Sequence, residues 1–540
     1  MTAWPRHAPR MAVLLALASV TWMFGGGQAA ADPRAAQPAG SGSWTVYHGA
    51  ADGAGVAGPV AAVDTSTRAW TSPPLDGELY GEPLVSSGHV YVATENDTVY
   101  ELSAATGAVV WSVHVGSPVP SAALPCGDIK PTVGITGTPV IDPSRGEIFV
   151  VAGELVHGKP AHVLTGLSTA SGKVEVTEDV DPAGADPVAL LQRTGLALDD
   201  GQVVFGMGGN DGDCASYRGR LIAVPEQGGA PKTFTVDAAA DESQGAIWMG
   251  GAAPVVGPGG GIWVTTGNGS VYSASHPYDN SDSVLDLSPS LKLAQFFAPA
   301  DWAANNSGDL DMSTAPALLS DGQVILTGKS RIVYLLDQAH LGGIGGQQAV
   351  LGSACGQDID GGVAVQGTTA YLPCTSGISA VRAVKSPAAL HLLWSSGTGG
   401  GPAIVAAGLV WTIGRNGVLY GLNPATGAVR QQASIGVPAN HFPTPAAAGR
   451  LLLAPAANQV VAFSATAGNP PAPPAASQPA PGGGAAGPAG GDGLPAGAIA
   501  GIAVAGLAVI GGMGWLVWRR RTTGSGLQAA AVQGQQTARP

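Results

Sequence analysis

Short apolar stretches run through most of the chain, and Gly, Pro, Asn and Asp separate them. Two typical stretches, Gly88–Ala93 and Thr98–Leu102, are rich in Val and Tyr and alternate between apolar and polar positions. Alternation with a period of two predicts half-buried β-strands joined by tight turns. The pattern therefore predicts an all-β fold between about residue 43 and residue 468.

These strands form a repeating unit, best preserved from Gly81 to Trp111. A Gly-x-Pro segment leads into it, a Gly turn opens an alternating strand, and a Thr-Gly turn opens a strand that ends on Trp111. Related units begin at Gly81, Gly137, Gly195, Gly251, Thr314, Gly361, Gly401 and Pro443. A spacing of roughly fifty residues is typical of propeller blades, so we predict an eight-bladed β-propeller of four-stranded blades, with seven blades as the alternative.

The last unit ends near Phe463 without its closing strand. We expect a segment between Val63 and Trp70 to supply that strand, because this would close the ring and remove an exposed sheet edge. The propeller domain is assigned to residues 32–468.

The two ends of the chain carry targeting and anchoring signals. Residues 1–31 combine Arg6 and Arg10, an apolar run and an Ala-rich exit, which predicts a signal peptide. Residues 469–495 are rich in Pro, Ala and Gly and predict a stalk. Residues 496–518 carry no charge and are long enough for a transmembrane helix. Arg519–Arg521 follow, which predicts a cytoplasmic tail over 519–540 and an extracellular propeller.

Charge narrows the choice of partners. The chain carries 24 Lys and Arg against 37 Asp and Glu, a net charge of −13, and charged residues make up only 11% of it. A nucleic-acid partner is excluded, because a phosphate-binding surface needs clustered cations. The signal peptide and the C-terminal segments are neutral or basic, so most of the acidic residues belong to the propeller. Its Asp-bearing loops are therefore the first candidates for a binding site.

The unit from Gly88 to Trp111 resembles the pyrroloquinoline-quinone (PQQ)-like repeat of the quinoprotein alcohol dehydrogenases and of an outer-membrane assembly scaffold lipoprotein. The turn Asn423–Gly427 matches that repeat as well. Gly206–Cys214, Gly267–Gly269 and Asp309–Asp311 resemble segments of secreted bacterial members. The resemblance implies blade structure, but the same motifs occur in catalytic and in scaffold proteins.

A quinoprotein dehydrogenase needs cations for the quinone carboxylates, usually a Ca²⁺ ion, and a carboxylate base. The adjacent Cys-Cys pair of that family and a C-x-x-C-H haem attachment are both missing from the sequence. We therefore predict a non-catalytic, membrane-anchored binding or scaffold module for a protein, glycan or cell-wall partner. The alternative is a dehydrogenase that oxidises an alcohol or sugar with PQQ and Ca²⁺.

Four isolated cysteines in a secreted chain predict two disulfides, with three possible connectivities. We expect Cys355 to pair with Cys374, 19 positions away, and Cys126 to pair with Cys214.

The candidate site residues lie in the longest loops, because loops on rigid scaffolds carry function. The candidate ligand contacts are Trp248, Tyr278, Trp302, Asp309 and Asp311. Possible Ca²⁺ ligands are Asn210, Asp211, Asp213, Asp279 and Asp282. Asp and Asn also cap tight turns, and that structural role is favoured for each cluster taken alone.

Overall fold

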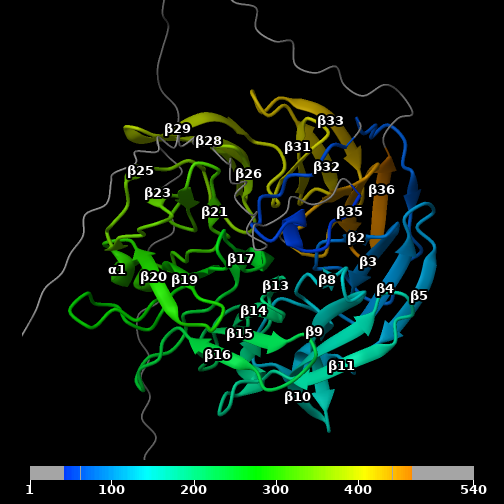
Figure 1. Cartoon of the computed structure of the whole chain (residues 1–540), viewed down its shortest axis with the longest axis horizontal. Coiled ribbons are helices and arrows are strands. Elements are labelled where there is room, and N and C mark those ends of the chain that lie inside the picture. Colours follow the sequence, from blue (N-terminus) through cyan, green and yellow to red (C-terminus); the bar gives the residue numbers. More distant parts are fainter. Residues whose placement is uncertain (1–41, 61, 441, 465–540) are drawn as a thin grey trace, which may run out of the picture. The chain divides into compact units, whose positions relative to one another are not determined.

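A computed structural model describes residues 42–60, 62–440 and 442–464. Eight sheets of antiparallel strands are arranged around a ring (Figure 1). The predicted all-β, eight-bladed propeller is confirmed. The predicted signal peptide, stalk, transmembrane helix and cytoplasmic tail lie outside the described residues.

Blades one to four are consecutive in sequence. Blade one contains β2 (Leu84–Ser86), β3 (His89–Ala93), β4 (Thr98–Ser103) and β5 (Val109–His114). Blade two contains β8 (Val140–Asp142), β9 (Glu147–Val156), β10 (Lys159–Ser168) and β11 (Val174–Asp179). Blade three contains β13 (Ala197–Asp199), β14 (Gln202–Gly209), β15 (Arg220–Pro225) and β16 (Lys232–Thr235), and β12 (Leu190–Leu191) also pairs with β14. Blade four contains β17 (Val255–Val256), β18 (Ile262–Thr266), β19 (Ser283–Leu287) and β20 (Leu293–Ala298), and β24 (Gly343–Ile344) adds a parallel edge strand.

Blades five to eight complete the ring. Blade five contains β21 (Ala317–Leu318), β22 (Gln323–Leu326), β23 (Val333–Asp337) and β25 (Ala349–Leu351). Blade six contains β26 (Ala364–Gln366), β27 (Thr369–Cys374), β28 (Gly377–Lys385) and β29 (Ala388–Ser396). Blade seven contains β30 (Ile404–Ala406), β31 (Leu409–Gly414), β32 (Val418–Leu422) and β33 (Val429–Ser434). Blade eight contains β34 (Ala446–Ala448), β35 (Leu451–Ala456) and β36 (Gln459–Ser464).

The ring closes through the N-terminal side of the chain, as predicted. β1 (Trp70–Thr71) pairs with β36 as the outer strand of blade eight, with Trp70 opposite Ala462. Asp64 N–H also donates to the carbonyl of Ser464 at 3.2 Å. Both ends of the described propeller therefore share one sheet.

The other described elements lie in the connections. They are the hairpin of β6 (Val119–Pro120) and β7 (Thr132–Val133), helix α1 (Trp302–Gly308), and the 3-10 turns η1 (Tyr47–Gly49), η2 (Ser121–Ala123), η3 (Pro187–Ala189) and η4 (Met249–Gly251). In the described part of the chain, no helix is long and apolar enough to cross a membrane.

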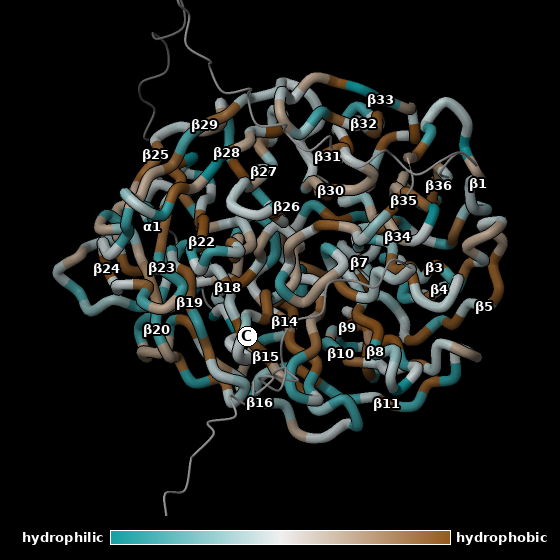
Figure 2. Tube along the Cα trace, turned by 45° about the horizontal axis from the view of Figure 1, so that its top comes forward, coloured by the Kyte–Doolittle hydropathy of each residue, from teal (hydrophilic) through white to brown (hydrophobic). Residues whose placement is uncertain are grey.

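The core lies between neighbouring blades, where apolar side chains from the inner three strands of each blade meet those of the next blade. Val90, Val99 and Leu102 of blade one are completely buried, and so are their counterparts around the ring. Figure 2 shows apolar stretches along the strands of every part of the ring, with polar stretches in many of the connections. Burial of this alternating pattern is the driving force for the fold.

The glycines that precede the inner strands allow successive blades to meet at the centre. A β-carbon on Gly137 would lie 2.2 Å from the carbonyl oxygen of Thr194, and one on Gly401 would lie 2.6 Å from that of Pro443. Any side chain at these positions would push two neighbouring blades apart. This close approach explains the Gly-x-Pro segments of the repeat.

The N-terminal segment 44–57 crosses the centre of the ring, where Figure 1 shows it in dark blue. Trp44 pairs with Val85 of β2, and Gly55 and Ala57 bond to Val405 of β30 on another side of the ring. Further backbone hydrogen bonds join Thr45 to Ile141, Ala51 to Val256 and Ala54 to Val365. The segment therefore bonds to the inner strands of five blades.

Candidate functional site

The two faces of the propeller differ in their connections. Because strands alternate in direction within each blade, connections from the second to the third strand and from one blade to the next share one face, the long-loop face. Its segments are 72–83, 94–97, 115–139, 157–158, 180–196, 210–219, 236–254, 267–282, 299–316, 327–332, 352–363, 375–376, 397–403, 415–417, 435–440, 442–445 and 457–458. The opposite, short-turn face holds 87–88, 104–108, 143–146, 169–173, 200–201, 226–231, 257–261, 288–292, 319–322, 338–348, 367–368, 386–387, 407–408, 423–428 and 449–450.

Acidic residues concentrate on one of these faces. The long-loop face holds 20 Asp and Glu against 6 Lys and Arg, whereas the short-turn face holds 3 against 4. Every candidate residue from the sequence analysis lies in the long-loop segments, and so do both disulfides except for Cys374, which ends β27 beside them. The net negative charge of the connecting loops is therefore concentrated on the long-loop face.

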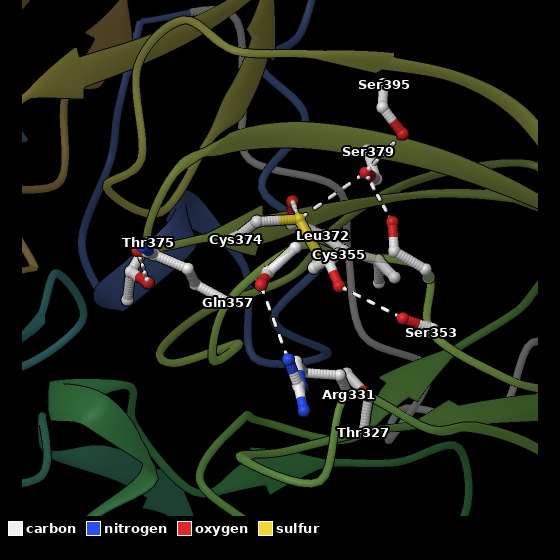
Figure 3. Close-up of a disulfide and its surroundings, with 12 residues drawn as sticks. Thr327, Arg331, Ser353, Cys355, Gln357, Leu372, Cys374, Thr375, Ser379 and Ser395 are labelled. Atoms are coloured by element: carbon white, nitrogen blue, oxygen red, sulfur yellow. Dashed lines mark hydrogen bonds between the residues drawn. A yellow bond between two sulfur atoms is a disulfide. The ribbon is translucent and has the colours of Figure 1, made fainter. Parts of the chain in front are cut away.

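The disulfides tie these loops together. The expected pairs are confirmed: Cys126 bonds to Cys214 and Cys355 to Cys374. Figure 3 shows the second bond beside Ser379, whose hydroxyl donates to the carbonyl of Ala354 at 2.8 Å. The first bond joins the 115–139 connection to the 210–219 loop of blade three.

Lys329 is the centre of a polar cluster between blades four and five. Its Nζ lies 3.0 Å from Asp309 Oδ1 and 2.5 Å from Asp311 Oδ2. Asn268 donates its side-chain amide to Asp309 at 2.9 Å and its backbone N–H to Asp311 at 2.7 Å. Burial opposes the charge of Lys329, but the two carboxylates outweigh it and raise its pKa. Two of the candidate ligand contacts, Asp309 and Asp311, therefore lie together.

Two other candidate residues face this cluster. Asp213 accepts a hydrogen bond from the Tyr217 hydroxyl at 2.8 Å, and burial together with Asp311 and Asp309 raises its pKa. Asp282 is completely buried, and burial followed by repulsion from Asp311 raises its pKa well above the usual range. Burial of this kind disfavours the charged form of a carboxyl group.

The remaining candidate metal ligands have local roles. Asn210 is buried and donates to the carbonyl of Val188 at 3.0 Å, whereas Asp211 is exposed. Asp279 Oδ1 accepts from the N–H and hydroxyl of Ser281 at 3.0 and 2.6 Å, as an Asx turn does. The five residues proposed from sequence do not form one shared hydrogen-bonded group.

The three aromatic candidates are largely structural. Trp302 is 2% exposed and packs edge-on to Tyr278 at 5.3 Å between ring centroids. Tyr278 also stacks on Phe296 at 4.7 Å. Trp248 donates its indole N–H to Gly209 at 3.0 Å and so holds blade three to the η4 turn. Only Trp248 and Tyr278 retain partial exposure.

Sequence reasoning missed two cations of this face. One is Lys329. The other is Arg193, which is half-buried, with its guanidinium 5.9 Å from the centre of the Tyr80 ring and 5.8 Å from that of the Phe442 ring. Burial lowers the pKa of Arg193, and Glu95 partly offsets this. The scarcity of Lys and Arg in these loops was the signal that would have singled them out.

The donor set does not fit a preformed quinone and calcium site. Lys329 is already neutralised by Asp309 and Asp311, and Arg193 lies between two aromatic rings. Within the described ranges, no three His, Cys, Asp or Glu side chains are arranged as a set of metal ligands. A tricarboxylate would also meet buried carboxyl groups such as Asp282 rather than free cations.

The fold has counterparts among solved structures. A quinohemoprotein alcohol dehydrogenase from Comamonas testosteroni aligns with a TM-score of 0.60 and 14% identity, over 79% of this chain and 81% of the other. A second such enzyme, from Pseudomonas putida HK5, aligns with a TM-score of 0.59 and 14% identity, over 80% and 82%. The family model described as outer membrane protein assembly factor BamB matches residues 56–274. The chain therefore has the fold of a PQQ-like β-propeller.

A europium-containing methanol dehydrogenase shares the PQQ-like fold with a TM-score of 0.58 and 12% identity, covering 79% of this chain and 98% of the other. At such identities the structural likeness establishes the architecture alone. No curated protein matches the sequence significantly. The resemblance predicted from the repeats is confirmed, and the activity has to be argued from the site.

Proposed function

We propose that this PQQ-like propeller is a non-catalytic binding module that presents its long-loop face to a cationic protein or cell-wall partner. The observation that carries the proposal is the charge asymmetry: 20 acidic against 6 basic residues on one face, and 3 against 4 on the other. Burial neutralises a few of these acids, among them Asp97 and Asp237, but the excess remains. A face of one charge sign attracts and orients a partner of the opposite sign.

The proposed location is the outer surface of the cell membrane. The predicted signal peptide would export the propeller, and the predicted helix 496–518 would anchor it with a cytoplasmic C-terminus. The predicted stalk would hold the propeller away from the membrane. The proposal thus combines a directional acidic face with a tether that leaves it free to meet a partner.

Charge reversal on the two faces tests the binding function. The probe is a Lys-rich peptide, titrated against the full-length protein in detergent at low and at physiological salt. Asp211→Lys and Asp241→Lys change exposed residues of the long-loop face, and Asp200→Lys is the matched control on the short-turn face. We expect binding that salt weakens, and a loss of affinity only in the first two variants. Equal loss in all three variants, or no binding of the peptide, would contradict the proposal.

The second candidate function is a dehydrogenase that uses PQQ and Ca²⁺. The likeness of the fold to quinohemoprotein alcohol dehydrogenases favours it, whereas the Lys329 cluster does not, because its ammonium group is already paired with Asp309 and Asp311. Calorimetry with PQQ and Ca²⁺, followed by a dye-linked assay with alcohols and sugars, separates the two functions. Tight quinone binding with turnover would establish the enzyme.

A further inference from the structure

A second acidic group lies on the long-loop face, at the junction of blades one and two. Asp97 ends the 94–97 loop and is completely buried, and neither of its carboxylate oxygens has a hydrogen-bond partner. Its backbone is in the left-handed region, with φ of 55°. A buried carboxyl group without a partner costs free energy, so its retention requires an explanation.

The groups that face Asp97 are themselves acidic. Burial, followed by repulsion from Glu154, Glu95 and Asp76, raises the pKa of Asp97 to about 9. Asp76 is occupied by hydrogen bonds from Thr94, Asn96 and Thr98. Glu95 keeps one buried oxygen, Oε1, without a partner. The surroundings of Asp97 therefore offer oxygen atoms and negative charge.

Two glycines, Gly134 and Gly116, allow the carboxylates of Asp97 and Glu154 to lie directly against the backbone. A β-carbon on Gly134 would lie 2.6 Å from Asp97 Oδ1 and 2.6 Å from the backbone oxygen of Glu95. A β-carbon on Gly116 would lie 1.6 Å from Glu154 Oε2. Only glycine leaves room for these oxygens.

Backbone hydrogen bonds connect the segments that carry Asp97, Gly116, Gly134 and Glu154. Val115 N–H donates to the carbonyl of Asp97 at 2.8 Å, one residue before Gly116. Gly153 N–H donates to the carbonyl of Gly134 at 3.0 Å, one residue before Glu154. Asp97 and Glu154 therefore both lie beside the backbone segments 115–116 and 133–134, at the base of the β6–β7 hairpin.

We propose that Asp97 and Glu154 bind a Ca²⁺ ion at the base of the β6–β7 hairpin, with the Glu95 carbonyl as a further ligand. Ca²⁺ accepts six to eight oxygen ligands in flexible geometry and combines carboxylates, carbonyls and water, so two carboxylates and one carbonyl leave positions for water. Mg²⁺ demands a stricter octahedron and suits such an irregular set less well. The site differs from the cation ligands expected from sequence, which lie in blades three and four.

The ion would have a structural consequence for the proposed binding face. It would join blade one to blade two beneath the excursion that carries Cys126, and so fix the loop that reaches across to Cys214. This inference does not depend on the identity of the partner at the long-loop face.

Calorimetric titration of the EDTA-treated full-length protein with CaCl₂, together with thermal unfolding, tests the site. We expect binding by the wild-type protein and a midpoint that rises by about 3 °C in excess Ca²⁺, with little effect of MgCl₂. Asp97→Asn should abolish both effects; Asn tolerates the left-handed backbone, so this variant should fold. The half-buried Glu154→Gln should weaken binding at least tenfold.

Asp237→Asn is the matched control. Asp237 is equally buried and lies on the same face, and both its oxygens lack partners, but Asp279 and Glu242 are its acidic neighbours. This variant should keep the Ca²⁺ response of the wild-type protein. No heat and no shift in the wild type, or an unchanged response in Asp97→Asn, would overturn the proposal and leave Asp97 as a buried neutral acid.

Discussion

Trp394, in the outer strand of blade six, donates its indole N–H to the carbonyl of Pro424 in blade seven at 2.9 Å. The indole ring covers Gly427 of the following Thr-Gly turn. Trp70 and Trp111 make the same contact with Ala104 and Thr169 of their neighbouring blades. The closing Trp and the Thr-Gly turn of the repeat are therefore two halves of one clasp between adjacent blades.

Replacing Gly427 by Ala should damage this clasp. The φ of Gly427 is 69°, and an added β-carbon would lie 2.5 Å from Trp394 Cε3. The left-handed backbone alone costs about 1–2 kcal/mol for a residue with a β-carbon, and displacement of the indole adds about 1–3 kcal/mol. Urea unfolding followed by Trp fluorescence measures the loss.

Gly408→Ala is the control for the backbone contribution. Its φ is 76°, but a β-carbon there would meet nothing within 4 Å. We expect Gly408→Ala to lower the free energy of unfolding by the backbone cost only. Equal losses in the two variants would show that the contact between Trp394 and the turn contributes nothing.

The clasp also shows why the architecture was predictable from sequence. Gly427 and Trp394 belong to a pattern that recurs in several blades, so a local motif specifies a contact that the ring repeats. Segment 44–57 has no such pattern. It bonds to inner strands as distant in sequence as Val85 and Val405, and those bonds exist only after the ring has closed.

The candidate site was predictable to a lesser degree, for the same reason. Asp309 and Asp311 were found because they lie two positions apart in one loop. Lys329, which joins them, lies in another blade's loop and has no distinguishing neighbour in sequence. Asp97 was missed because a single Asp in a tight turn is indistinguishable from an ordinary turn residue until its burial and lack of partners are known.

Asp237 should make the protein less stable as the pH rises. Burial, followed by repulsion from Asp279 and Glu242, raises the pKa of Asp237 to about 9, whereas an unfolded Asp has a pKa of about 3.9. The folded state therefore binds the extra proton, and its contribution to stability is lost as the pH rises from about 4 toward 9. Asp237→Asn should raise the free energy of unfolding by about 2–4 kcal/mol at pH 8, with little change at pH 4. Urea titrations at the two pH values, both in EDTA, measure the difference; a gain of the same size at both would refute this assignment.

Removing the charge of Lys329 should destabilise the protein more than removing the charge of its exposed partner Asp309. Lys329→Met removes the cation that neutralises Asp311, which is 1% exposed, and so leaves a carboxylate buried without a counter-charge. Breaking a buried pair from one side costs about 3–5 kcal/mol. Asp309→Asn removes only an exposed contact and should cost under about 1 kcal/mol. Thermal and urea unfolding of both variants measure the costs, and similar costs would mean that Asp311 is not dependent on Lys329.

The two disulfides should differ in how readily they are reduced in the folded protein. Cys355 and Cys374 are 5% and 3% exposed, and Ser379 lies 3.4 Å from the Cys374 sulfur, so an attacking thiolate has little access. Cys214 is exposed and its partner Cys126 is half-buried. Because thiol–disulfide exchange requires access to a sulfur atom, mild dithiothreitol under native conditions should reduce Cys126–Cys214 first. Alkylation with iodoacetamide and peptide mass spectrometry give the order, and treatment in urea, where both bonds should be reduced together, is the control. Reduction of Cys355–Cys374 first under native conditions would mean that blade six opens more readily than the loops of the long-loop face.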